Sequence, residues 1–170
     1  MAATRITEPK AEEYSDVISH SALKGVQTVA LIAPPALLVH SIYRKSFRIS
    51  SYLRSVALST FTIGPAIGVG LAAYRMSGMN DLEVKAKAMK VKANAHQRRC
   101  DDYSVIGGVL GALGMTTIFL KRARIPWVIG SGAAFGVAGG VIAHTLKDVQ
   151  EGEEIHPIKE VEGALGVKNN

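Results

Sequence analysis

Histidine, cysteine and acidic side chains are the groups in this sequence that could do chemistry, and they are scattered along it. His40 and His144 fall near the ends of long apolar segments, and Cys100 is the single cysteine. Such histidines are more typical of interfacial polar groups than of ligands, and one cysteine cannot form an internal disulfide. Phosphate-loop, CxxC, HExxH and GxSxG motifs and metal-ligand spacings are all absent. We therefore predict no catalytic residue, no cofactor and no bound metal, and hence a protein that is not an enzyme.

Charged residues are missing from four long segments, which is the strongest pattern in the sequence. The uncharged segments are residues 25–43, 55–74, 103–120 and 125–146. A helix rises about 1.5 Å per residue, so about 20 apolar residues cross the hydrocarbon core of a bilayer. Lipid cannot hydrogen-bond the backbone, so each span should be helical. The alternative, a soluble bundle, requires a polar helix face that residues 128–146 lack. We predict an all-α protein with four transmembrane helices.

The chain divides around this predicted membrane domain, residues 22–146. Its spans are expected at residues 22–43, 55–74, 103–120 and 125–146. Residues 1–21 carry mixed charges and are predicted to form a soluble arm. Residues 147–170 are acidic and are predicted to form a soluble tail.

The connection between the second and third spans is predicted to contain a short amphipathic helix. At helical spacing one face would present Leu82, Ala86, Met89, Ala93 and His96. The sides and back of this helix would carry Lys85, Lys87, Lys90 and Lys92. A basic amphipathic helix on a headgroup surface fits this pattern, and a solvated helix packed on a partner fits it equally.

Glycines at four-residue spacing mark the expected helix contacts, because small residues let membrane helices approach closely. The predicted packing glycines are Gly64, Gly68, Gly107, Gly111, Gly132, Gly136 and Gly140. The first span lacks such a ridge, so we expect it to be peripheral.

The two short loops contain only basic charges and are expected to meet lipid headgroups. Their predicted headgroup-binding residues are Arg44, Lys45, Arg48, Arg54, Lys121, Arg122 and Arg124. Basic short loops face the negatively charged compartment. In a mitochondrion that is the matrix, which places both termini in the intermembrane space. The net charge is +6, and the charged residues flank the spans. This favours bound phospholipid such as cardiolipin and gives no reason to expect nucleic acid.

The segment RRCDDYSVIGGVLGALG, residues 98–114, resembles the signature of the Tim-type inner-membrane preprotein translocase subunits and their relatives. Arg98, Asp101 and Asp102 match its arginine and paired acids, and Gly107 and Gly111 match its glycine-rich third span. The two acids could also cap the start of that span, where the helix dipole favours negative charge. The family includes accessory membrane subunits of respiratory complex I, and the chain as a whole looks most like the NUXM-type subunit.

The resemblance implies a mitochondrial inner-membrane protein whose partners are other membrane subunits of a large complex and phospholipids. We expect a non-catalytic accessory subunit of the membrane arm of NADH:ubiquinone oxidoreductase. The alternative is a component of a preprotein translocase. Its groove would be lined by the modest polar side chains of the spans, which are Ser59, Thr60, Thr62, Thr116 and Thr117. A small solute or lipid transporter ranks last, because its usual mark is an intramembrane charge.

Overall fold

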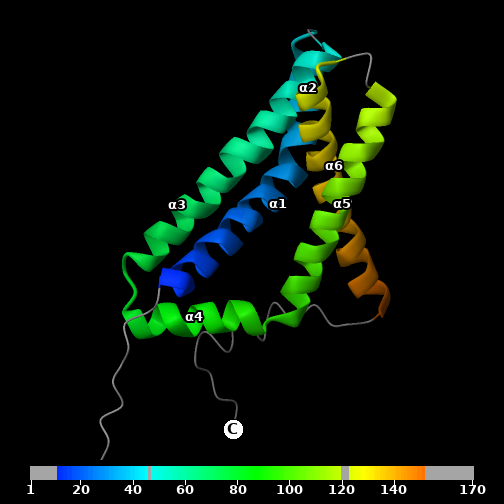
Figure 1. The fold of residues 1–170 in the computed structure, drawn as a ribbon. Coiled ribbons are helices and arrows are strands. Elements are labelled where there is room, and N and C mark those ends of the chain that lie inside the picture. Colours follow the sequence, from blue (N-terminus) through cyan, green and yellow to red (C-terminus); the bar gives the residue numbers. More distant parts are fainter. Residues whose placement is uncertain (1–10, 46, 120–122, 152–170) are drawn as a thin grey trace, which may run out of the picture.

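The computed structural model describes residues 11–45, 47–119 and 123–151, and every regular element in these ranges is a helix (Figure 1). The elements are α1 (Ala11–Tyr43), α2 (Ile49–Leu58), the π-helical turn η1 (Ser59–Ile63), α3 (Gly64–Met76), α4 (Asp81–Ala93), α5 (Ala95–Phe119) and α6 (Ile125–Glu151). Because α2, η1 and α3 are continuous, they form one rod. That rod, α1, α5 and α6 are each long and apolar enough to cross a membrane. The predicted all-α fold with four spans is confirmed.

The four long helices form two antiparallel pairs, α1 with α3 and α5 with α6 (Figure 1). The pairs meet at the end where α2 lies, because α1 and α2 both contact α6 there. Toward the other end the pairs diverge, and α4 lies across the wide end between them (Figure 1). The described part of the chain is therefore wedge-shaped, with α4 and the first turns of α1 and α5 at its wide end.

All four long helices extend beyond the predicted spans, and the rod of the second span runs from Ile49 to Met76. α1 begins at Ala11, so part of the expected N-terminal arm continues directly into the first span, and α6 runs on to Glu151. α5 begins at Ala95, so Asp101 and Asp102 lie inside the helix and do not cap its start as expected. The physical reason is that loss of hydrophobicity marks the edge of the lipid, whereas a helix with solvated polar side chains continues past it. The rest of the arm and tail, residues 1–10 and 152–170, lies outside the described residues.

The loop helix exists as α4, but the face predicted to be apolar is not the one that packs. Leu82 and Met89 are 59% and 56% exposed, whereas Val84 and Ala88 are buried. Val84 and Ala88 are four residues apart and form a second apolar stripe, which lies against the wide end of the wedge. Helical spacing alone could not decide between the two stripes.

Polar contacts fasten α4 to the start of α1. The Asp16 carboxylate and the Lys92 ammonium are 2.5 Å apart, and the Tyr14 hydroxyl donates to Asp81 Oδ1 at 3.2 Å. The hydrogen bond to Asp16 raises the pKa of Lys92. At its own N-terminus α4 is closed by a capping box between Asn80 and Glu83. α4 is thus held in place as part of the bundle.

Candidate functional site

Glycines bring the backbones of α5 and α6 into direct contact. The contact is made by Gly107 and Gly111 on α5 and by Gly132, Gly136 and Gly140 on α6. A Cβ built at any of the five would overlap main-chain atoms of the facing helix, so even alanine would force the helices apart. All five were predicted as packing residues from their spacing.

A second glycine contact joins α1 to α3 and corrects the expectation for the first span. Gly64 and Gly68 on α3 face the backbone of α1 at Gly25 and Ser21. A Cβ at Gly25 would overlap the carbonyl oxygen of Gly64. The first span is therefore not peripheral. One glycine on α1 is enough, because the facing helix supplies the other small residues.

A polar network bridges the two helix pairs across the wedge. The Lys24 ammonium lies 2.7 Å from Asp101 Oδ1, and Gln27 Nε2 donates to the same oxygen at 2.9 Å and to Ser104 Oγ at 2.8 Å. His20 Nδ1 lies 3.4 Å from the other oxygen of Asp101. Gln27 and Ser104 are buried, so these bonds replace water that the site excludes. The network ties α1 to α5 at a fixed depth.

A cluster of His96, His144 and Asp148 lies where α5 begins and α6 ends. His144 is buried; its Nδ1 lies 2.7 Å from Asp148 Oδ2 and its Nε2 lies 3.3 Å from the carbonyl oxygen of His96. His96 Nε2 lies 3.7 Å from the same carboxylate oxygen. The expectation that the histidines and acids share no metal-ligand spacing is wrong here, because one ligand atom from each residue falls within 4.8 Å of the others. Two imidazoles and one carboxylate are a ligand set that zinc accepts.

His144 also differs from the interfacial group expected from its position. Its ring packs edge-on against the His96 ring, with centroids 4.9 Å apart, and lies 5.4 Å from the Tyr103 ring. His40, by contrast, is exposed near the end of α1. The contact between His144 and Asp148 could have been predicted from the sequence, because the two residues are four apart on one helix. Nothing in the sequence indicated that His96 of α5 would join them.

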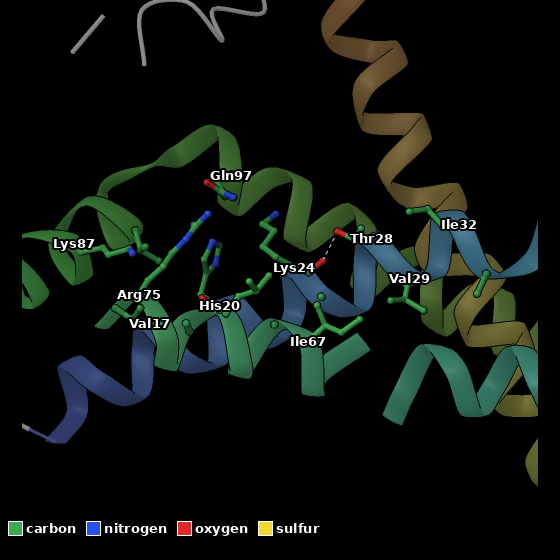
Figure 2. Close-up of a pocket in the computed structure, with 17 residues that line it drawn as sticks. Val17, His20, Lys24, Thr28, Val29, Ile32, Ile67, Arg75, Lys87 and Gln97 are labelled. Atoms are coloured by element: carbon green, nitrogen blue, oxygen red, sulfur yellow. Dashed lines mark hydrogen bonds between the residues drawn. The ribbon is translucent and has the colours of Figure 1, made fainter. Parts of the chain in front are cut away.

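A cavity of about 730 Å³ opens between α1, α3 and α4 in the wide part of the wedge, and Gln97 of α5 completes its lining. The basic and polar side chains of its lining gather toward the α4 end, where Val17 and Val91 also line it: His20, Lys24, Arg75, Lys87 and Gln97 (Figure 2). Away from α4 the lining becomes apolar, with Val29, Ile32 and Ile67 on the other side of the view (Figure 2). The cavity therefore has a cationic end and a hydrocarbon-like end.

The predicted headgroup residues lie at the opposite, narrow end of the wedge. The described ones are all exposed: Arg44, Lys45, Arg48, Arg54 and Arg124. The Arg54 guanidinium lies 5.4 Å from the centre of the Trp127 ring, a cation–π distance. Lys121 and Arg122 lie outside the described residues.

The charged residues of the family motif differ in their exposure and contacts. Arg98 and Asp102 are exposed, while Asp101 turns inward to the network with Lys24. One feature of the sequence could have indicated the Lys24–Asp101 pair. Both residues lie just outside uncharged segments and so at the same edge of the membrane. The cavity could not be predicted in this way, since its lining comes from four helices.

Comparison with known proteins gives one family. A search of curated proteins finds no match for this chain. A family model matches residues 3–147, which include α1 to α5 and most of α6. The chain therefore belongs to the family described as "Protein of unknown function (DUF1757)".

Proposed function

We propose that this chain is a non-catalytic accessory subunit of the membrane arm of mitochondrial NADH:ubiquinone oxidoreductase. It would sit in the inner membrane with both termini in the intermembrane space and stabilise the assembly by packing against neighbouring subunits and lipid. The likeness of residues 98–114 to the Tim-type signature supports the mitochondrial location, and the four apolar helices support the location in a membrane.

The outward surface of α5 is the observation that carries the proposal. α5 contacts α6 along its glycine edge, and only 11% of the most apolar part of α5 is buried within the chain. The large apolar side chains left exposed are Val105, Ile106, Val109, Leu110, Leu113 and Ile118. Such a helix needs lipid or another subunit on most of its circumference.

Glycines on the outer surface support a protein neighbour in addition to lipid. Gly70, Gly114 and Gly139 have no atom within 4 Å of an added Cβ, so the packing of this chain does not use them. Small residues on a lipid-facing helix let another helix approach closely. Gly114 lies on the same helix as the exposed apolar side chains.

The test is to follow the tagged full-length chain after solubilising mitochondria in a mild detergent. We expect it to comigrate on native gels with the band that has NADH dehydrogenase activity, and its depletion to lower the amount of that band. Gly114→Leu should weaken comigration while the purified protein stays folded, because the added side chain enters open space. Migration as a small free species would contradict the proposal.

A preprotein translocase component is the second candidate, and the cavity is the observation that favours it. A laterally open groove is what a substrate segment would need, but the lining of this one is basic at its polar end. The polar side chains expected to line a groove are elsewhere: Thr60 is buried, and Thr116 and Thr117 bond carbonyls of their own helix. Because mitochondrial presequences are themselves basic, the cavity should repel them. Depletion that blocks import and leaves NADH oxidation intact would favour this candidate.

A further inference from the structure

Two cations in the cavity between α1, α3 and α4 have no acidic partner among the described residues. Arg75 reaches the cavity from the end of α3 and Lys87 from α4. Lys24 lines the same end, but its charge is met by Asp101 at 2.7 Å. No acid is among the described residues that line the cavity, and His20 adds a further nitrogen (Figure 2). This end of the cavity is therefore complementary to an anion.

The cavity changes character with depth along the helices. On α1 the polar lining residues His20, Lys24 and Thr28 are followed by Ile32, and His20 and Ile32 are separated by a rise of about 18 Å along the helix. On α3 it runs from Arg75 back to Ile67. Val17 and Val91 also line the α4 end, but all of the charged groups lie at that end and the deeper lining is mostly apolar. This is the order of headgroup and hydrocarbon in one bilayer leaflet.

The apolar part is open sideways. Ile32, Ile67 and Leu71 line the cavity and are 60%, 48% and 54% exposed. A ligand could therefore enter from the membrane plane. The volume of about 730 Å³ lies within the range of about 300–1,000 Å³ usual for small-molecule sites.

We propose that this cavity binds one anionic phospholipid of the leaflet on the α4 side. The phosphate would sit between Arg75 and Lys87, and an acyl chain would lie along Ile32 and Ile67. The site is at the opposite end of the molecule from the basic short loops. A lipid fits better than a soluble anion because most of the lining is apolar, and its deeper part lies within the spans. The inference does not depend on which complex contains the protein.

Native mass spectrometry of the full chain in detergent micelles tests this site, with palmitoyl-oleoyl phosphatidylglycerol and phosphatidylcholine as probes. We expect one phosphatidylglycerol to be retained in preference to phosphatidylcholine. R75Q/K87Q should weaken its binding about 25-fold, because each cation near an anionic lipid contributes about fivefold. K85Q/K90Q is the matched control: it also removes two positive charges, both from residues of α4 that do not line the cavity, and it should bind like the parent protein.

A second variant tests the acyl part and separates lipid from free phosphate. I32W should fill the apolar end and lower phosphatidylglycerol binding, and inorganic phosphate should not displace the lipid. The proposal is wrong if the two lipids are retained equally, or if both double variants lose binding to the same extent. It is also wrong if inorganic phosphate competes and I32W has no effect. Circular dichroism of each variant verifies that the helices are intact, and I67W replaces I32W if that variant does not fold.

Discussion

Gly136 is the position where one methyl group should most clearly test the contact between α5 and α6. A Cβ there would lie 2.6 Å from the carbonyl carbon of Gly107 and 3.0 Å from the Cα of Gly108, whereas ordinary contacts are 3.4–4 Å. Both neighbours are main-chain atoms, so no side chain can rotate away. G136A must therefore separate the helices locally by about 1 Å, an overpacking that costs about 1–3 kcal/mol. G136L should cost more.

The matched control is G139A, on the same helix. A Cβ at Gly139 meets nothing within 4 Å, and alanine is a better helix former than glycine by about 1 kcal/mol. We therefore expect G139A to be as stable as the parent protein or slightly more stable. The assay is thermal unfolding of the purified proteins in one detergent, followed by far-ultraviolet circular dichroism. A cost of 1 kcal/mol corresponds to roughly 2–4 °C in the midpoint for a chain of this length.

The outcome that refutes the reasoning is a G136A variant that is as stable as both the parent protein and G139A. That result would mean that the backbones of α5 and α6 are not in contact at Gly136, and that the glycine spacing reflects only the general frequency of glycine in membrane helices. A loss of stability in G139A as large as that in G136A would instead place a neighbour on the outer face of α6.

The polar network, α4 and the histidine cluster each give a further prediction. Asp101→Ala should lower the free energy of unfolding by about 1–3 kcal/mol, because the buried amide of Gln27 and the ammonium of Lys24 lose their acceptor. Asp102→Ala should change it by less than about 0.5 kcal/mol. Equal effects of the two variants in thermal unfolding would contradict the inward orientation of Asp101. Val84→Ser should speed amide hydrogen exchange in α4 and Leu82→Ser should not, since only the former is buried; the reverse order would restore the face expected from the sequence. His144→Ala should cost about 1–3 kcal/mol in the same unfolding assay, because the buried Asp148 carboxylate loses its nearer imidazole and the contact of His144 with the His96 carbonyl is lost. An unchanged midpoint would mean that the cluster does not fasten α5 to α6.

The sequence predicted which segments form helices better than it predicted which helices pack against one another. Charge-free segments require lipid, and backbone in lipid must be helical, so the four spans followed from composition along the chain. Glycine spacing likewise marked Gly132, Gly136 and Gly140 as one ridge, because a four-residue repeat places them on one helix face. Helix ends were less accurate: the start of α1 at Ala11 could not be read from hydropathy, which reports the edge of the lipid.

What the sequence by itself determined about this protein is which segments enter the membrane and which of their residues are small enough for close packing. These are local properties, fixed by side-chain chemistry and helical period. Only the tertiary structure decided that Gly25 meets Gly64, that Val84 and not Leu82 packs beneath the wedge, and that Arg75 and Lys87 share a cavity. Each of these depends on how distant helices cross. Because lipid solvates every apolar helix face about equally well, hydrophobicity does not choose which faces meet, and backbone fit and paired charges do.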